Sequence, residues 1–155
     1  MKQEHKLVAE IYRYIASFID ADEQVYICLD GQAADNGVRQ GLFTDGTIPD
    51  MWFTFVNKKY PTLIEAKTID TNNRMLLMQS QLRAWRTNGC GAHVPEFWIA
   101  VNRAFDQFYF WTQADFLQRL DSSDAQGNTL TLLRPTQAVT FNNAQQLALH
   151  ILRSA

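Results

Sequence analysis

Two apolar runs separated by a polar break decide the fold of this chain: Gly46-Thr47-Ile48-Pro49-Asp50-Met51-Trp52-Phe53-Thr54-Phe55 and Thr62-Leu63-Ile64-Glu65-Ala66-Lys67. The break, residues 57–61, holds turn formers, so the two runs are expected to fold back on each other as a β-hairpin. Side chains on a strand alternate between faces, so Glu65 and Lys67 share one face. The hairpin sets Asp50 opposite Lys67 to within one or two residues. Two carboxylates and one ammonium group are therefore expected to meet at one edge of a sheet.

Such a grouping suits hydrolysis assisted by a divalent cation. Mg²⁺ prefers oxygen ligands, usually one or two carboxylates together with waters and phosphate oxygens. The bound ion lowers the pKa of a water molecule and neutralises charge that builds up on a phosphoryl group. Lys67 would orient or deprotonate that water and offset charge in the transition state. The residues alone thus predict metal-assisted phosphodiester hydrolysis, with Mg²⁺ or Mn²⁺ as the cofactor.

Pro49-Asp50 and Glu65-Ala66-Lys67, with fourteen residues between them, resemble the signature of the PD-(D/E)XK nuclease superfamily. The resemblance implies that Asp50 and Glu65 bind Mg²⁺, that the backbone carbonyl of Ala66 adds a ligand, and that Lys67 assists the attacking water. It also implies a restriction-endonuclease-like α/β fold, a three-layer α/β/α core whose central mixed sheet is flanked by helices. The competing interpretation of the motif is a hairpin that carries an ordinary surface ion pair.

The resemblance further implies an acidic group from the first helix of the chain. Apolar residues at spacings of three and four predict that helix over residues 4–19. Glu10 lies at the margin of the apolar stripe and is the candidate for a catalytic role. Its alternative role is a solvated ion pair with Lys6 or Arg13.

A second helix is predicted over residues 72–87, with Asp70, Thr71 or Asn72 as its N-cap. In several nucleases of this type, the helix after the Glu-x-Lys strand carries a glutamine followed four residues later by an aromatic residue. Gln81 and Trp85 are similar, which makes Gln81 a catalytic candidate, and Gln79 is the alternative. A neutral amide suits the position because it can hydrogen-bond a phosphate, a water or Lys67 without repelling any of them. Both glutamines are equally interpretable as exposed residues of a core helix.

Apolar runs and turn residues predict the secondary structure of the rest of the chain. We expect loop at 30–46, strands at 25–29, 97–101 and 107–111, a helix at 113–120, short edge strands at 130–133 and 138–141, and a last helix capped by Asn142 or Asn143. No repeat or linker interrupts the sequence, so residues 1–155 are expected to form one domain. The resembled core covers about residues 4–120, and residues 121–155 form a C-terminal extension.

Composition excludes several classes of protein. The 155 residues are 46% hydrophobic and 19% charged, as in a globular protein. No apolar run approaches the ~18 residues of a membrane span, so no membrane partner is expected. The N-terminal residues lack the apolar core of a signal peptide, and Cys28 and Cys90 lack metal-type spacing. We therefore expect a cytoplasmic protein with reduced thiols.

Positive charge is concentrated around the proposed site. Residues 58–103 hold seven basic and three acidic residues, which leaves 14 − 7 = 7 basic and 16 − 3 = 13 acidic residues elsewhere. A localised basic face can bind a polyanion although the net charge is −2. DNA is thus the expected partner, and the candidates for contacts with its phosphates are Lys58, Lys59, Arg74, Arg83 and Arg86. Chance clustering on a solvated helix is the alternative.

A Mg²⁺-dependent endonuclease acting on DNA is the function that the sequence predicts best. The alternative is a catalytically inactive nuclease-fold module that binds nucleic acid or a protein partner. A third interpretation is an unrelated α/β protein in which the motif is a coincidence, and finding Asp50 and Glu65 on opposite faces would confirm it. The sequence leaves the oligomeric state open, with a homodimer among the alternatives.

Overall fold

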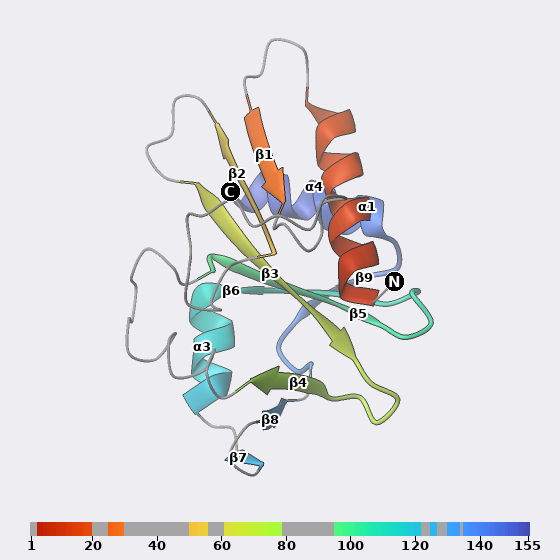
Figure 1. The fold of residues 1–155 in the computed structure, drawn as a ribbon, viewed down its shortest axis with the longest axis vertical. Helices are drawn as coiled ribbons and strands as arrows, with labels where there is room; N and C mark the ends of the chain where they lie inside the picture. Colours follow the sequence, from red (N-terminus) through yellow and green to blue (C-terminus); the bar gives the residue numbers. More distant parts are fainter. Residues whose placement is uncertain are drawn as a thin grey trace.

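The computed structural model describes residues 3–19, 25–29, 50–55, 61–78, 95–121, 125–126, 130–133 and 135–155. Its helices are α1 (Gln3–Phe18), α3 (Gln113–Asp121) and α4 (Ala144–Ser154). Its strands are β1 (Val25–Leu29), β2 (Met51–Phe55), β3 (Thr62–Ile69), β4 (Met75–Met78), β5 (Phe97–Asn102), β6 (Phe108–Thr112), β7 (Ala125–Gln126), β8 (Leu130–Leu133) and β9 (Val139–Phe141) (Figure 1). The described chain is a mixed α/β protein.

Within these residues, nine strands form one mixed sheet. The main path runs β7-β8-β4-β3-β5-β6-β9, and β2 joins β3 while pairing with β1 on its other side. The contact between β3 and β5 is parallel, and the other strand pairs are antiparallel. A parallel contact between strands that are not adjacent in the chain needs a crossover connection. The connection from β3 to β5 includes β4, and residues 79–94 of it lie outside the described part of the chain.

The sheet divides along one edge of β3. The first residues of β3, 62–64, pair with β2, whereas at its far end Ile69 pairs with Met75 of β4. Among the described strands, none pairs with residues 65–68 on this edge. On the opposite edge, β5 pairs with β3 continuously from Ile64 to Ile69. The Glu65-Ala66-Lys67 segment therefore lies where β2 and β4 separate, on a strand that is held firmly from its other side.

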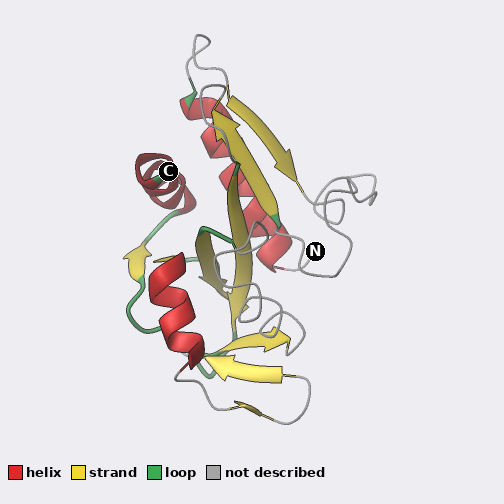
Figure 2. Ribbon diagram, turned by 90° about the vertical axis from the view of Figure 1, so that its left-hand side faces the viewer, coloured by secondary structure: helices red, strands yellow, loops and turns green. Residues whose placement is uncertain are grey.

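Helices α1 and α4 cover one face of the sheet. Leu7, Val8, Ile11 and Ile15 repeat at helical spacing along α1 and are fully buried. They pack with buried residues of α4, among them Leu147, and with Ile64, Ala66, Phe97, Ile99 and Val101 of β3 and β5. Figure 2 shows α1 and α4 toward the β1–β2 end of the molecule and α3 toward the β4 end. The predicted first helix is thus confirmed, with its start at Gln3.

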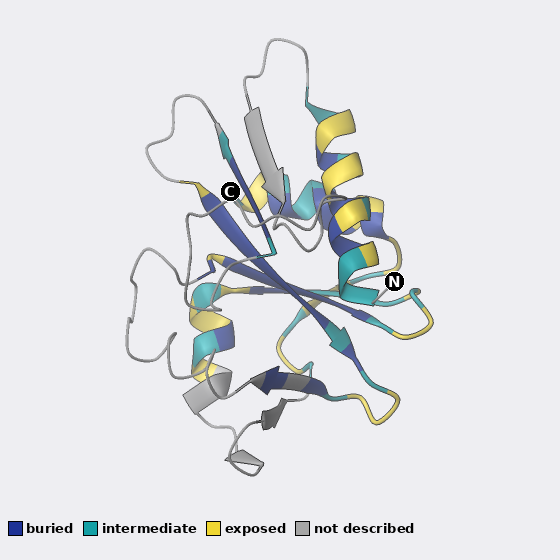
Figure 3. Cartoon of the chain, in the orientation of Figure 1, coloured by how far each residue is buried: buried dark blue, intermediate teal, exposed yellow. Residues whose placement is uncertain are grey.

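A second apolar cluster covers the other face and includes Phe116 of α3. Side chains of β5 alternate between the two clusters, so Trp98 and Ala100 face this side. The ring of Trp98 stacks on Phe116 with centroids 4.6 Å apart, and Trp111 meets Phe116 edge to face at 5.6 Å. Figure 3 shows that β3 and β5 are buried along almost their whole length. The central strands therefore lie between apolar layers on both faces.

The prediction of a helix over residues 72–87 is wrong for its first part, residues 72–78. Residues 75–78 form β4, whose Met75 and Leu77 are both fully buried two positions apart. The register of β4 with β8 pairs residues 75–78 with residues 133–130. A tertiary partner 50 or more residues away thus overrides the helical spacing of the methionines. Residues 79–87 lie outside the described part of the chain.

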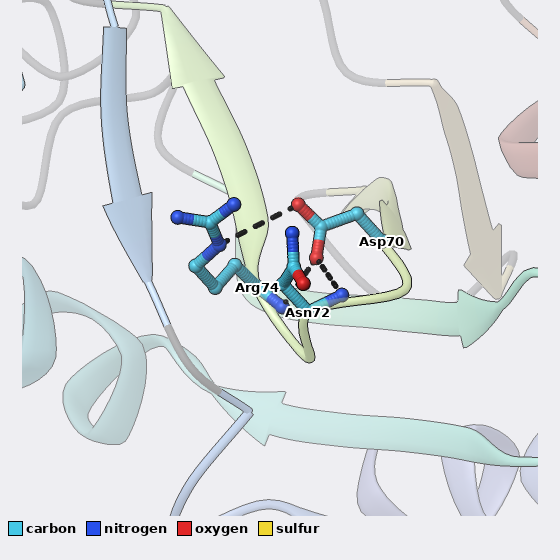
Figure 4. A network of polar contacts seen from close by, with 3 residues as sticks. All are labelled: Asp70, Asn72 and Arg74. Carbon is cyan, nitrogen blue, oxygen red and sulfur yellow. Dashed lines mark hydrogen bonds and ion pairs between the residues drawn. The ribbon is translucent and has the colours of Figure 1, made fainter.

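The expected cap residues serve instead as the turn between β3 and β4. The Oδ1 atom of Asp70 accepts hydrogen bonds from the backbone N–H groups of Asn72, at 2.8 Å, and Arg74, at 3.0 Å (Figure 4). Asn73 takes the left-handed conformation, with φ of 60°, which asparagine tolerates better than most residues. The chemistry that caps a helix therefore closes a hairpin here.

Residues 125–155 add strands to both ends of the sheet. Strands β7 and β8 extend it beyond β4, and β9 pairs with β6 at the opposite edge. The predicted strand at 130–133 is therefore present as β8, but it lies between β4 and β7 and is not an edge strand. Asn143 caps α4, accepting a hydrogen bond from the backbone N–H of Gln146 at 2.9 Å, as expected. No described helix is long and apolar enough to cross a membrane.

Candidate functional site

Three polar side chains meet where the sheet divides. The register of β2 with β3 sets Met51 opposite Ile64, and continuing it by one residue sets Asp50 opposite Glu65. Lys67 is then two residues from the Asp50 position, within the tolerance of the prediction. Glu65 and Lys67 lie beside Trp98 and Ala100 of β5, on the face of the second apolar cluster. The expected sharing of one face by Glu65 and Lys67 is confirmed.

Short contacts hold the three groups together. Asp50 Oδ2 accepts a hydrogen bond of 2.7 Å from the backbone N–H of Ala66, the residue between the other two. Lys67 Nζ lies 3.3 Å from Glu65 Oε1. The Asp50 carboxyl and Glu65 also share a side-chain hydrogen bond. Asp50 is therefore tied to the backbone of β3 between Glu65 and Lys67.

These charged groups are largely removed from water. Glu65 is 4% exposed and Lys67 is 8% exposed, which is rare for charged residues unless they are paired. Asp50 is half-buried as a residue, but its carboxyl group is deeply enclosed by protein atoms. The cost of burying such charges requires compensation by hydrogen bonds or by opposite charge. One ammonium group offsets one of the two carboxylates, so the site as described retains an excess of negative charge.

The pKa values of both carboxyl groups are raised, and burial is the main cause. Burial raises the pKa of Asp50 well above its ordinary value, and the negative charge of Glu65 raises it further. The Ala66 N–H group and the charge of Lys67 act in the opposite direction. Burial likewise raises the pKa of Glu65, against the lowering effect of Lys67. Two carboxylates that resist ionisation together form a centre that an added cation would stabilise.

A third carboxylate, Glu4 of α1, acts on the same site. Its negative charge raises the pKa of both Asp50 and Glu65. Glu4 continues the buried stripe of α1, with Val8, Ile11 and Ile15 following at spacings of four, three and four. The helix therefore directs Glu4 toward the sheet at the point where the stripe ends. Glu4 was not among the residues expected from the sequence, because helical spacing alone also places Glu10 near the stripe.

Glu10, the predicted acid of α1, lies six residues further along, about 9 Å along the helix axis. Its Oε1 atom lies 3.6 Å from the guanidinium group of Arg13, which is three residues further along the same helix. This is the solvated pairing that the sequence offered as the alternative for Glu10. Within the described helix, Glu4 and not Glu10 therefore has the electrostatic link to the Asp50–Glu65 pair.

Arg74, a predicted phosphate contact, lies in the turn that follows β3. Its Nε atom is 3.6 Å from Asp70 Oδ2, so part of its charge is balanced within the turn (Figure 4). Its contact with DNA stays a prediction. Five further candidates lie outside the described residues: Lys58, Lys59, Gln79, Gln81 and Arg83. Arg86 lies outside them as well.

The donor set suits a hard divalent cation. Among the described residues, no group of three or more His, Cys, Asp or Glu side chains could hold a metal ion. Mg²⁺, however, is commonly bound by one or two carboxylates, with waters and substrate oxygens completing its coordination. Asp50 and Glu65 supply two such carboxylates, and burial, which raises the pKa of both, disfavours their charged forms in the absence of a cation. The residues present therefore fit the ion that the sequence predicts.

Removing one charge should stabilise the protein in the absence of metal. A carboxyl group whose pKa is raised by folding binds more protons in the folded state, so its contribution to stability falls as the pH rises through that pKa. Asp50→Asn removes the charge and keeps an oxygen that can accept the Ala66 N–H bond. At pH 8 in EDTA we expect the free energy of unfolding to rise on the order of 1 kcal/mol. Thermal melts from pH 5 to pH 8 test this.

The matched control for Asp50→Asn is Asp115→Asn, which changes an exposed aspartate on α3. Asp115 lies in the first turn of α3, where its charge favours the helix, so Asp115→Asn should lower the melting temperature slightly and by the same amount from pH 5 to pH 8. A melting temperature of the Asp50→Asn variant below that of the wild type at pH 8 would contradict the electrostatic account.

Comparison with known proteins assigns no family. No protein-family model matches the chain, and no curated protein matches it. The proposals below therefore rest on the geometry of the site and on its motif.

Proposed function

We propose that this chain is a metal-dependent nuclease that hydrolyses phosphodiester bonds in DNA, on a restriction-endonuclease-like fold. The observation that carries the proposal is the buried grouping of Asp50, Glu65 and Lys67 at the division of the sheet. An ordinary surface ion pair would be exposed and contribute little. Here two carboxylates are buried with one ammonium group, at a cost that a structural role alone does not explain.

The fold supports the same proposal. Strands β1, β2 and β3 form an antiparallel unit, and β3 continues in parallel contact with β5. Helices α1 and α4 pack on one face of this sheet, and α3 packs on the other. A mixed sheet between helical layers, with Asp50 at the start of β2 and Glu65 within β3, is the arrangement that the resembled fold implies.

Each side chain has a role that follows from its position. Asp50 and Glu65 would hold Mg²⁺ or Mn²⁺, with the Ala66 carbonyl as a further ligand. Bound there, the ion would acidify a water molecule and neutralise charge on the phosphoryl group. Lys67, held 3.3 Å from Glu65, would orient the attacking water or accept its proton, and its charge would offset charge in the transition state. Glu4 would add negative charge that favours cation binding.

The substrate follows from the charge distribution. The excess of basic residues in 58–103 surrounds the Glu-x-Lys segment in the sequence, so a polyanion is the expected ligand. Contacts with phosphates position a nucleic acid without reading its sequence. We therefore propose DNA cleavage without assigning a target sequence.

The test is a cleavage assay on supercoiled plasmid and on single-stranded DNA, with Mg²⁺, with Mn²⁺ and with EDTA. Cleavage should require the metal and should be lost in Glu65→Ala. Glu4→Gln should reduce cleavage at limiting metal, whereas Glu10→Gln should behave as the wild type. Metal-independent cleavage, or cleavage that survives Glu65→Ala, would overturn the proposal. Binding of DNA by wild-type protein without cleavage would favour the inactive module instead.

A further inference from the structure

The edge of β3 that faces β2 and β4 presents the backbone groups of alternate residues. In a strand, the N–H and C=O groups of one residue point to one edge, and those of the next residue point to the other. The N–H of Ala66 donates to Asp50, and the N–H of Asp70 donates to the backbone oxygen of Arg74 at 2.8 Å. Even-numbered residues of this segment therefore face this edge, so the N–H of Thr68 points to the place where the sheet divides.

The opposite edge of β3 is occupied by β5. The backbone oxygen of Leu63 accepts from the N–H of Glu96 at 2.9 Å, and the parallel pairing continues without a break from Ile64 to Ile69. Odd-numbered residues supply the groups on that side, as the alternation requires. The edge beside β2 and β4 is thus the one from which a ligand can reach the backbone of residues 65–68.

The hairpin of β3 and β4 opens after one pair of residues. Ile69 pairs with Met75, and the same register would next set Thr68 opposite Leu76. Instead, every residue of β4 pairs with β8, and the register of β3 with β2 ends at Ile64. Among the described strands, none pairs with Thr68 on this edge. A backbone N–H group that is removed from water needs a partner, so the place beside Thr68 suits a ligand that accepts a hydrogen bond.

The N–H of Thr68 lies close to the groups that would hold the cation. The N–H of Ala66, two residues earlier, is bound by Asp50 Oδ2 at 2.7 Å. Two residues of a strand span about 6.6 Å, and the C=O of Ala66 points to the same edge between the two N–H groups. Mg²⁺ lies about 2 Å from its oxygen ligands. A phosphate group bound to the ion through one oxygen would therefore reach the N–H of Thr68 with another.

A neutral donor suits this position for a chemical reason. Negative charge in phosphoryl transfer is spread over the non-bridging oxygens, and donors that are fixed in advance stabilise it without reorganisation. The N–H of Thr68 is fixed because β5 pairs with β3 along this segment. Unlike a lysine, it carries no charge that would compete with the cation for Asp50 and Glu65.

We propose that the backbone N–H of Thr68 binds a non-bridging oxygen of the phosphate that is hydrolysed, next to the cation held by Asp50 and Glu65. The inference deepens the proposed function and rests on it, because the ion brings the phosphate to this edge. The side chain of Thr68 is not needed. Strand alternation places it on the face of Ala66 and α1, opposite to the face of Lys67.

The test is NMR spectroscopy of ¹⁵N-labelled wild-type protein with Mg²⁺ and thymidine 5′-monophosphate. A hydrogen bond to the phosphate should move the amide proton resonance of Thr68 downfield and should produce a ¹⁵N–³¹P coupling across the bond. Both effects should require Mg²⁺ and the nucleotide together. The amide of Asp70 is the internal control, because it faces the same edge but is bonded to the backbone oxygen of Arg74. Its resonance should stay in place.

Two substitutions at one position separate the backbone from the side chain. Thr68→Ala keeps the N–H group and should cleave plasmid DNA as the wild type does. Thr68→Pro removes the N–H group, and no described strand uses that group as a donor. Loss of one such donor typically costs about 10²-fold or more in rate, so cleavage by Thr68→Pro at saturating Mg²⁺ should fall by that factor. Its dissociation constant for Mn²⁺ should equal that of the wild type.

The outcomes distinguish this inference from the proposed function. If Mg²⁺ and the nucleotide shift the amide of Ala66 and leave that of Thr68 in place, the role of Thr68 is wrong and the nuclease proposal stands. Wild-type cleavage by Thr68→Pro, or loss of cleavage in Thr68→Ala, would also overturn the role of the N–H group. If Mg²⁺ alone shifts no resonance of residues 64–68, both proposals are wrong. Should Thr68→Pro fail to fold, the NMR measurement on wild-type protein decides.

Discussion

Replacing Lys67 with methionine should slow metal-dependent DNA cleavage by about 10²–10⁴-fold while Mn²⁺ still binds. The loss corresponds to the usual contribution of a positioned acid–base group. Methionine keeps the length of the apolar stem in a site where Lys67 is almost fully buried. Because the ammonium group lies 3.3 Å from Glu65, its removal takes away a charge that competes with the metal for that carboxylate. Mn²⁺ affinity should therefore be maintained or increased.

Single-turnover cleavage of plasmid DNA at saturating Mn²⁺, with calorimetry for the metal, measures both effects. Lys67→Arg separates the two roles proposed for the lysine, because arginine keeps the positive charge but cannot act as a base in a protein. Partial activity in Lys67→Arg would assign charge stabilisation or orientation of the water, and full loss would assign proton transfer. Wild-type cleavage by Lys67→Met, or loss of its Mn²⁺ binding, would refute the proposed role.

Mn²⁺ at about 100 times its dissociation constant should stabilise the folded protein by about 2.7 kcal/mol. For a chain of 155 residues, this corresponds to a rise in melting temperature of roughly 5–10 °C. The physical reason is the pair of enclosed carboxyl groups: burial raises the pKa of both Asp50 and Glu65, and the charge of Glu65 raises the pKa of Asp50 further. A cation bound between the two carboxyl groups would offset the negative charge that burial disfavours. The ion should therefore bind the folded state in strong preference to the unfolded chain.

The same pKa values predict how the effect of Mn²⁺ depends on pH. In metal-free protein, a raised pKa means that the carboxyl groups retain protons to a higher pH than exposed acids do. Metal binding must displace those protons, so the affinity should increase as the pH rises through the raised pKa values. Melts at fixed Mn²⁺ between pH 5 and pH 8 measure this trend. Glu65→Gln should abolish most of the rise in melting temperature.

Glu10→Gln is the matched control for the metal-dependent melt, because it removes a carboxylate of α1 that is paired with Arg13. Its response to Mn²⁺ should equal that of the wild type. An equal rise in melting temperature for Glu65→Gln and wild type would show that the ion binds elsewhere.

The local pattern of the sequence was sufficient for the hairpin and its site. Alternation along residues 62–67 separates Glu65 and Lys67 from Ile64 and Ala66, and the structure confirms that separation. The turn-forming break aligns Asp50 with this segment, because a hairpin register depends on residues that are close in sequence. Asp50 and Glu65 do not lie on opposite faces, the arrangement that would have confirmed an unrelated α/β protein. The nuclease activity itself stays a proposal.

The sequence pattern failed where a distant segment decides the structure. The Met75–Met78 run is compatible with a helix or a strand, and pairing with β8 selects the strand. The sequence pattern singled out Glu10 and not Glu4 for a similar reason. Both glutamates lie near the apolar stripe of α1, and only the placement of that helix on the sheet distinguishes the one whose charge acts on the site.

Local patterns in the chain were enough to assign Asp50, Glu65 and Lys67 to one hairpin and one face, because strand alternation and hairpin register depend on near neighbours. Long-range packing was needed to separate β2 from β4 along β3 at this segment, to enclose the carboxyl groups and to bring the charge of Glu4 to bear on them. Burial and the pKa values that follow from it depend on every layer packed around the sheet, and those layers come from segments far apart in the chain.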